Sequence, residues 1–258
     1  MSNKRGQVTI FIIIAILIVA SILIFFLWIK PNISTPSTAG NLGIETCMKD
    51  VIEQESGNLA KSAGYFNPEF YYTYQDMKIG YLCYTNLYFQ PCINQEPLLK
   101  QNFERELVKA SQEKINKCYD NSLNELKRMG YNVVGENKDL KISVDSNKIS
   151  VELDAPVVLS KDSSSRFTKF NTEINSPIYN ILMISTSIIQ SETAFGDSDI
   201  NSIMLLYPEY TIDKLKQTDG TTVYIIEDKQ SKIKFQFATR SYALYPGYGT
   251  GTEDALTG

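Results

Sequence analysis

The strongest hydrophobic pattern in the chain is an uncharged, mostly apolar run near its beginning. Residues 8–29 contain no charged side chain, and at the helical rise they span about 33 Å, enough to cross the hydrocarbon core of a bilayer. Lys4 and Arg5 precede the run, and a single Lys30 follows it. The basic side should stay in the cytoplasm. We therefore predict one transmembrane helix, residues 7–30, with the N-terminus cytoplasmic.

A cleaved secretory signal is the alternative interpretation of this run. Ile18 and Ala20 form a crude small-residue cleavage pattern. The run continues to Trp28, however, beyond the apolar length of about 7–15 residues that is usual in a signal peptide. The sequence favours an anchor that contacts membrane lipid through residues 8–29.

A polar linker, residues 31–43, follows the run. Pro31 and Pro36 stop a helix, and the small polar residues around them build no core. The one N-x-[ST] sequon of the chain begins at Asn32. On an exported segment it is a glycosylation candidate, with a chance match to the motif as the alternative.

Helical spacing returns in residues 44–130, on both sides of an aromatic block. Apolar residues recur three or four positions apart over Ile44–Ala63 and again over Pro97–Met129, which predicts two helices. The block between them, residues 65–89, is rich in tyrosine. We expect short strands or an ordered aromatic loop there, at Tyr71–Tyr74 and Tyr81–Tyr84.

From Tyr131 the apolar period changes from helical spacing to alternation. Leu140–Val144 and Ile149–Leu153 alternate around a polar turn, which predicts an antiparallel hairpin. Val157–Leu159 could continue the second strand, and Ser163–Ser165 is predicted as a loop. The later elements are expected to be a helix at 177–195, a short helix within 197–206, and a meander of strands at 210–217, 221–227 and 232–239.

These elements predict an α+β ectodomain with two subregions. Residues 44–130 would form a helical, cysteine-containing, aromatic-rich subdomain, and residues 131–245 a subdomain of mixed sheet and helix. The tail, residues 246–258, has no apolar period. We expect it to be disordered or to depend on a partner for its conformation.

Four cysteines, Cys47, Cys83, Cys92 and Cys118, all follow the predicted anchor. An even number in an oxidising compartment favours two disulfides. Three pairings are open, and we favour Cys83–Cys92 across a short loop with Cys47–Cys118 between the two helices. A tetrathiolate zinc site is the alternative, but the chain has no C-x-x-C pair.

Charge and composition exclude several functions. All 29 Asp and Glu residues lie after residue 30, and the chain has a net charge of −4, which argues against nucleic acid as a partner. There is no histidine, so Ser-His and Cys-His nucleophile systems are absent. A carboxylate pair could still hydrolyse glycosides. We predict a non-enzyme with no catalytic residue, metal or cofactor, and an exported carboxylate-dependent enzyme is the alternative.

Two short motifs are better explained by structure than by chemistry. Ser111 and Lys114 match an S-x-x-K acylase element without its companion motifs, and we expect both on a helix surface. The segment beginning at Asp197 resembles the start of an EF-hand loop but has Ser202 and Pro208 where that loop needs Gly and Glu. We expect Asp197 or Ser198 to cap a helix instead.

The aromatic block is the best candidate for a recognition surface. Tyrosine offers a flat apolar face and a hydroxyl group, which suit protein or glycan contacts. Packing in a core under the Cys83–Cys92 loop is the alternative. The candidate residues are Tyr71, Tyr72, Tyr74, Tyr81, Tyr84 and Tyr88.

The residues before the apolar run, Lys4–Thr9, add a resemblance to a known family. A basic pair, Gly6 at the end of a short leader, Gln7 as the new N-terminus and a hydroxyl at Thr9 resemble the class III signal peptide of archaeal type IV pilin-like proteins. The resemblance implies that a prepilin peptidase removes residues 1–6 and leaves the anchor. The fifth mature residue is Phe11 where that family usually has Glu, which docks subunits into filaments.

The rest of the chain resembles uncharacterised, membrane-anchored archaeal proteins that have this leader. Together these observations predict a single-pass membrane protein with an extracytoplasmic domain that acts in envelope organisation, adhesion or pilus-like filament assembly. Its partners would be copies of itself or another surface protein or glycan. An accessory subunit of a membrane complex is a further alternative.

Overall fold

The computed structural model describes residues 17–19, 21, 43–135, 138–161 and 164–243. The chain divides into two units, Met1–Asn41 and Leu42–Gly258. In the first unit, residues 17–19 and 21 are helical. Within the described part of the chain, no helix is both long and apolar enough to span a bilayer. Most of the predicted transmembrane helix, residues 7–30, lies outside the described residues.

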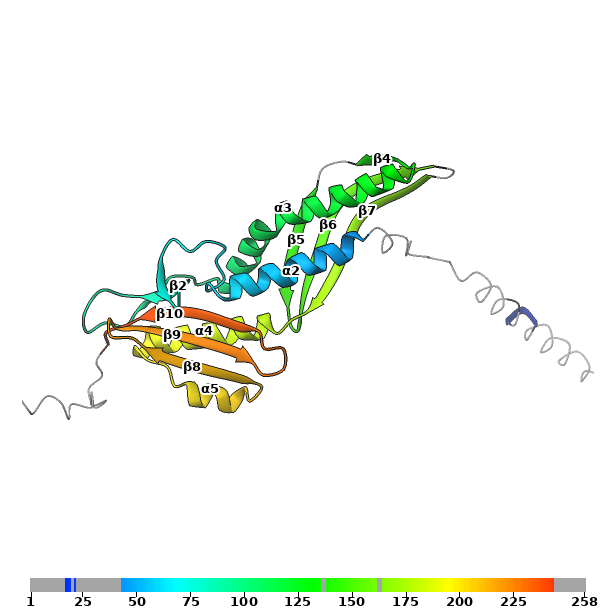
Figure 1. Ribbon diagram of the computed structural model, residues 1–258. Coiled ribbons are helices and arrows are strands. Elements are labelled where there is room, and N and C mark those ends of the chain that lie inside the picture. The colour runs from blue at the N-terminus through cyan, green and yellow to red at the C-terminus, as the bar shows by residue number, and fades with distance from the viewer. Residues whose placement is uncertain (1–16, 20, 22–42, 136–137, 162–163, 244–258) are drawn as a thin grey trace, which may run out of the picture. The chain divides into compact units, whose positions relative to one another are not determined.

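One sheet of the second unit comes from the middle of the chain. A long strand, β6, pairs antiparallel with β7 along one side and with β5 and β4 along the other. Helices α2 and α3 pack against each other and against this sheet (Figure 1). These elements are α2 (Ile44–Ala60), α3 (Leu99–Arg128), β4 (Asn132–Gly135), β5 (Asp139–Asp145), β6 (Lys148–Ser160) and β7 (Ser164–Asn175).

The alternation of β6 explains how this sheet is covered. Its residues switch regularly between buried and half-exposed, because successive side chains of a strand point to opposite faces. Ile149, Val151 and Leu153 are buried, whereas Ser150 and Glu152 between them are only half-buried. One face of the sheet is thus buried under α2 and α3, and the other is polar.

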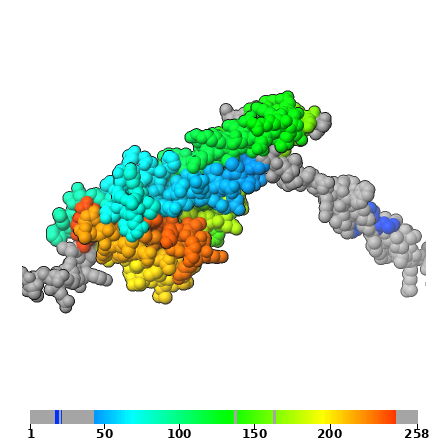
Figure 2. Space-filling model, viewed as in Figure 1, coloured from blue at the N-terminus to red at the C-terminus, as the bar shows by residue number. Residues whose placement is uncertain are grey.

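The second sheet joins strands from both ends of the unit. Its order is β1-β2-β10-β9-β8, with β3 also paired to β2, and β2 runs parallel to β10. The cyan segment that contains β1 and β2 lies next to the orange and red strands in the space-filling view (Figure 2). The elements are β1 (Tyr71–Tyr74), β2 (Met77–Tyr84), β3 (Ile93–Asn94), α4 (Ile178–Phe195), α5 (Ile200–Leu206), β8 (Tyr210–Lys216), β9 (Thr221–Asp228) and β10 (Lys234–Arg240).

Helix α4 covers the inner face of this second sheet. It contacts β2, β3, β9 and β10, and its Ile181 and Ile188 are fully buried. On the facing strands, the rings of Tyr224 and Phe237 stack with centroids 5.2 Å apart. Phe235 is buried beside them. This aromatic and aliphatic layer is the core that supports the candidate pocket described below.

Two disulfides fix the N-terminal half of the unit. Cys47 bonds to Cys118 and joins α2 to α3, and Cys83 bonds to Cys92 and closes the loop between β2 and β3. These are the two pairs that the sequence favours. Disulfides of this kind are consistent with an oxidising, extracytoplasmic location.

Within the described part of the second unit, the expected helices and hairpins are confirmed, but strands β3, β4 and β7 were not predicted. Ser163–Ser165 was predicted as a loop, whereas β7 begins at Ser164. The register between β6 and β7 shifts between Asp154 and Val157. As a result, Phe167 and Phe170, two buried residues of β7, are three positions apart, and the strand lacks the alternation by which strands are recognised.

The structure differs from the sequence-based expectation at the subregion boundary and at Ser111. The sheets do not follow the expected boundary at residue 130, because β2 pairs with β10 and α2 packs on β7. The prediction that Ser111 lies on a helix surface is wrong, since Ser111 is fully buried in α3. Lys114, three residues later, is on the outside of α3 and forms an ion pair of 2.6 Å with the buried Glu55 of α2.

Candidate functional site

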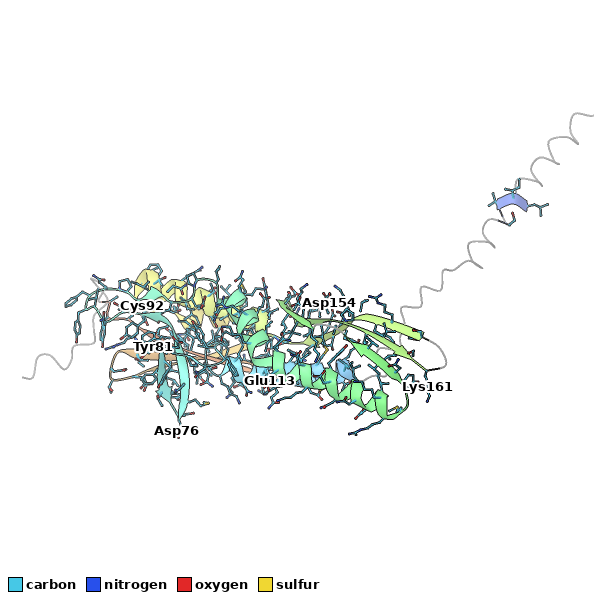
Figure 3. The ribbon with its side chains drawn as sticks, turned by 90° about the horizontal axis from the view of Figure 1, so that it is seen from above. Asp76, Tyr81, Cys92, Glu113, Asp154 and Lys161 are labelled. Atoms are coloured by element: carbon cyan, nitrogen blue, oxygen red, sulfur yellow. A yellow bond between two sulfur atoms is a disulfide. The ribbon has the colours of Figure 1, made fainter. Side chains whose placement is uncertain are left out.

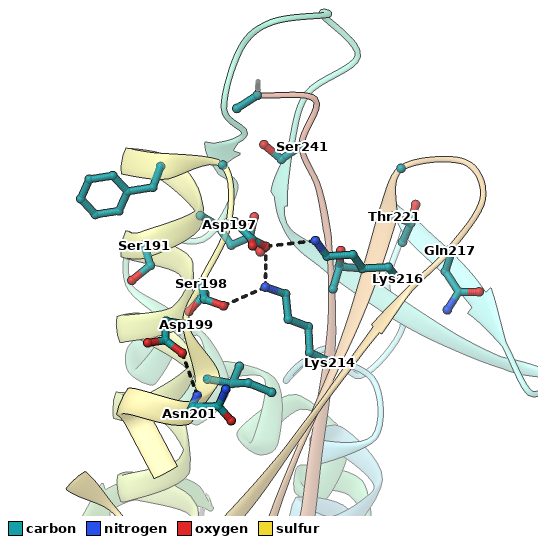
Figure 4. A pocket seen from close by; sticks show the side chains of 17 residues that line it. Ser191, Asp197, Ser198, Asp199, Asn201, Lys214, Lys216, Gln217, Thr221 and Ser241 are labelled. Carbon is teal, nitrogen blue, oxygen red and sulfur yellow. Dashed lines mark hydrogen bonds and ion pairs between the residues drawn. The ribbon is translucent and has the colours of Figure 1, made fainter. Parts of the chain in front are cut away.

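A pocket of about 1010 Å³ lies at one end of the second sheet. Its walls are the C-terminal end of α4, the connection from α4 to α5, the ends of β8 and β9 that meet at the intervening turn, and residues 241–243 (Figure 4). Ligand pockets commonly have volumes of roughly 300–1,000 Å³. This pocket is therefore large enough for a small molecule or a short oligomer.

Lys214 organises one wall of the pocket. It lies on the face of β8 that is turned toward α4, opposite Tyr224 of β9, with its Nζ 5.9 Å from the centre of the Tyr224 ring. The Nζ donates to the Asp197 carboxylate and to the carbonyl oxygen of Ser198, the latter at 2.7 Å. Lys216 Nζ lies 3.6 Å from the same Asp197 carboxylate. Both lysines therefore hold the α4–α5 connection against β8.

Glu192 lies at the inner end of this wall. It is only 2% exposed, and the Tyr224 hydroxyl donates a hydrogen bond to its carboxyl group. Burial raises the pKa of Glu192, and the hydrogen bond from Tyr224 opposes that effect. Glu192 is the sole charged residue of α4, and it falls on the same helical stripe as the buried Ile181, Ser185 and Ile188.

The position of Glu192 could have been recognised from the sequence, although it was not predicted as a site residue. A single acid on the buried stripe of an otherwise uncharged helix points to a carboxyl group with a special environment. The pairing of Asp197 with Lys214 and Lys216 could not be predicted from the sequence, because only the fold brings β8 beside the α4–α5 connection.

The start of α5 corrects the predicted helix cap. Asp199, rather than Asp197 or Ser198, caps this helix: its carboxylate accepts hydrogen bonds from the backbone N–H of Asn201 at 3.0 Å and from Ser202. Asp197 is free to pair with Lys214 instead. Among the described residues, no group of three or more Asp, Glu, Cys or His side chains could hold a metal ion.

Four of the six predicted recognition tyrosines are buried or half-buried. Tyr81 is buried in a cluster with Ile79, Val223 and Ala238, on the face of the second sheet opposite α4. Its hydroxyl lies 2.8 Å from the Thr221 hydroxyl. Figure 3 shows Tyr81 within the body of the unit, whereas Asp76 is at the tip of the β1–β2 turn. The partly buried tyrosines that pack against the cluster are Tyr72, Tyr74 and Tyr84.

Two of the six tyrosines remain exposed, and Tyr88 is by far the more accessible. Tyr71 is at the margin of exposure and has Lys78 Nζ 4.4 Å from its ring centre. Tyr88 is 71% exposed and lies on the disulfide-closed loop between Leu87 and Phe89, which are also exposed. The side chains of this loop are accessible for the surface contact that the sequence predicts.

The segment 240–242 connects this loop to the pocket. Tyr242 lies with its ring 4.9 Å from that of Tyr88, and its carbonyl oxygen accepts a hydrogen bond of 3.1 Å from the Phe89 N–H. Arg240 donates to the hydroxyls of Tyr84, at 2.9 Å, and Tyr242, at 2.6 Å. The two neighbours of Tyr242 in the chain, Ser241 and Ala243, line the pocket.

Several predicted features lie outside the described residues. These are the leader-processing residues Gly6 and Gln7, the sequon at Asn32 and the tail 246–258. The four cysteines are described, and all of them are in disulfides.

No protein-family model, curated protein or solved structure matches the chain. The class of molecule therefore follows from the structure alone: a mixed α+β protein with two disulfides, which are consistent with an extracytoplasmic location.

Proposed function

We propose that this protein is a membrane-anchored cell-surface protein that works by binding another surface protein, in envelope organisation, adhesion or filament assembly. The uncharged run at residues 8–29 would hold it in the membrane, and the leader ending at Gly6 would be removed. The two disulfides support an exported domain.

The observation that carries the binding role is the loop closed by Cys83 and Cys92. Three consecutive large side chains on it, Leu87, Tyr88 and Phe89, are exposed, the last by 74%. Scattered apolar residues on a surface are common, whereas three adjacent ones on one loop favour a contact site. Aromatic anchors of this kind contribute most of the binding energy in many protein–protein interfaces.

The loop is held in place rather than left to move freely. The disulfide pins both ends, and backbone hydrogen bonds of 3.0 and 3.1 Å tie Thr85 and Phe89 to residues 240 and 242. A loop that is already ordered loses little conformational entropy when a partner binds. The exposed side chains are therefore pre-organised for contact.

The position of the loop fits presentation away from the anchor. The first described residue of the second unit is Gly43, just before α2. In Figure 1 β2 and its loops lie at one end of the unit, and α2 starts nearer the other end, where β4 and β7 lie. An anchored protein would thus hold its apolar loop at the far end of the domain from its point of attachment.

The test is photo-crosslinking in intact cells that carry the full-length protein. A photo-reactive phenylalanine analogue replaces Tyr88 in one variant and Met129 in a matched control. Both positions are well exposed, but Met129 follows α3 at the end of the unit near β4 and β7. We expect one defined envelope protein to be crosslinked from position 88 and not from position 129.

The same crosslink should disappear when Leu87→Ser and Phe89→Ser are combined in the chain. A crosslink to a second copy of the chain would support the filament version of the proposal. Equal crosslinking from positions 88 and 129, crosslinks to lipid alone, or protection of the domain from protease added outside the cells would each contradict the proposal.

A further inference from the structure

The pocket beside the disulfide-closed loop contains hydrogen-bonding groups that have no partner within the described protein. The hydroxyl oxygens of Ser198 and Ser241 are buried and have no hydrogen-bond partner among the described residues. Ser198 as a whole is only 4% exposed. A buried hydroxyl left without a partner costs roughly 1–3 kcal/mol, so two of them in the wall of one pocket suggest that a bound molecule supplies the missing bonds.

The charges of the pocket are compensated from within the protein. Asp197 neutralises Lys214 and lies 3.6 Å from Lys216, and the Asp199 carboxylate is engaged by the start of α5. Burial favours the neutral form of Glu192 by raising its pKa. A strongly charged ligand would have to break these pairs, whereas a neutral ligand would not.

The remaining lining groups suit a ligand with many hydroxyls. Hydroxyl and amide side chains both donate and accept hydrogen bonds, and Asn201 and Thr222 line the pocket. Ser191 and Gln217 also line it, with side chains that already donate to the carbonyl oxygens of Ser187 and Leu215. Phe195, another lining residue, is 61% exposed and offers an apolar ring. A sugar has the matching surfaces, hydroxyls at its edge and C–H groups on its faces.

We propose that this pocket binds a neutral carbohydrate, one or a few sugar units of a glycan, through hydrogen bonds from its hydroxyls to Ser198 and Ser241 and contact of a C–H face with Phe195. The site is separate from the protein-binding loop, so either proposal can fail while the other stands.

The test is calorimetric titration of the full-length protein in detergent with three neutral trisaccharides, maltotriose, mannotriose and chitotriose, and with a trimer of galacturonate as the charged comparison. We expect at least one neutral trisaccharide to bind and the galacturonate trimer to bind more weakly. Combining Ser198→Ala with Ser241→Ala should weaken binding of that trisaccharide at least tenfold, and Phe195→Ser should weaken it as well.

Ser111 provides the matched control, because its hydroxyl is also buried and unpartnered, but in α3 and outside the pocket lining. Ser111→Ala and Ser198→Ala should both leave the melting temperature unchanged or raise it, since neither removes a hydrogen bond within the described protein. Only Ser198→Ala should change the affinity for the trisaccharide.

The loop variant Leu87→Ser with Phe89→Ser should bind the trisaccharide normally, which separates this site from the protein-binding proposal. The inference would be overturned if no neutral trisaccharide binds, if the serine variants bind as tightly as the natural protein, or if the galacturonate trimer binds best. A serine pair that serves only to hold water would give the second of these results.

Discussion

The hydroxyl of Tyr224 donates a hydrogen bond to the carboxyl group of Glu192, and both side chains are buried between α4 and the second sheet. The pair joins the helix to β9 in the layer directly under the pocket. A carboxyl group in such a place favours its protonated form, because burial penalises the charge. Glu192 should therefore contribute to the pH dependence of the stability of the fold.

The first prediction concerns Glu192→Gln. In the natural protein, burial raises the pKa of Glu192 above the ordinary value of 4.5. At a pH between the ordinary pKa of the unfolded chain and the raised pKa of the folded protein, the unfolded chain releases the proton of Glu192 while the folded protein keeps it. The contribution of Glu192 to stability is therefore complete below pH 4.5 and is lost as the pH rises through the raised pKa. Glutamine stays neutral and lacks this loss.

The free energy of unfolding of Glu192→Gln, measured by denaturant titration, should therefore gain on that of the natural protein as the pH rises. Glu227 is the matched control. It pairs with Lys234 at the surface, and this pairing lowers its pKa, so Glu227→Gln should lose stability relative to the natural protein above pH 4.5. The same pH profile for both variants would show that Glu192 is not specially placed.

The second prediction compares the two disulfides. Cys47 and Cys118 are 71 positions apart in the sequence, and Cys83 and Cys92 are nine apart. Loop entropy predicts that the longer link stabilises the fold by roughly 4 kcal/mol and the shorter one by roughly 2.5 kcal/mol. Replacing each pair by serines should give these losses in the free energy of unfolding.

Opening the Cys83–Cys92 loop should in addition make the chain sensitive to limited proteolysis between Thr85 and Pro91, while the Cys47→Ser, Cys118→Ser variant should not show cleavage there below its unfolding transition. A larger stability loss from the shorter link would contradict the prediction.

The sequence predicts the elements of this fold better than their arrangement. The stripe of α4 and the alternation of β5 and β6 are local patterns, and each was visible from the residues alone. The parallel pairing of β2 with β10 joins residues more than 150 positions apart, and no local pattern specifies it. For the same reason, the walls of the pocket, which come from α4, β8, β9 and residues 241–243, could not be assembled from the sequence.

The tyrosines show a different limit of sequence reasoning. An aromatic block predicts burial and recognition equally well, because the same ring serves both. Tyr81 and Tyr88 are seven positions apart, yet one is buried and the other is 71% exposed. What separates them is that β2 ends at Tyr84 and the disulfide-closed loop then turns outward.

This difference gives the third prediction. Tyr81→Ala removes ring contacts with Phe70 and Tyr84, at centroid distances of 4.8 and 5.0 Å, and a hydrogen bond to Thr221. We expect it to lower the free energy of unfolding by about 3–5 kcal/mol, as for other large buried aromatics.

Tyr88→Ala should lower the free energy of unfolding by less than about 1 kcal/mol, because it loses mainly one exposed ring contact with Tyr242. A variant that combines Tyr88→Ala with the photo-reactive phenylalanine analogue at position 89 should not crosslink the partner. If Tyr88→Ala proved as destabilising as Tyr81→Ala, the loop would be part of the core and not a contact surface.

The last prediction concerns the glycine that ends α4. Gly196 has φ = 71°, a left-handed conformation that costs an L-residue roughly 1–2 kcal/mol. A methyl group added there would lie 2.2 Å from Cβ of Ala243, which lines the same pocket. Gly196→Ala should therefore destabilise the fold by at least about 1–2 kcal/mol and weaken trisaccharide binding, because the 241–243 segment must move.

Two companion variants separate the causes. Gly57→Ala, inside α2 with no atom within 4 Å of the added methyl, should raise the free energy of unfolding by roughly 0.5–1 kcal/mol, because alanine favours a helix over glycine. Adding Ala243→Gly to Gly196→Ala removes the clash but not the left-handed strain. That double variant should recover trisaccharide binding while remaining less stable than the natural protein. If binding is not recovered, the clash between residues 196 and 243 is not what weakens it.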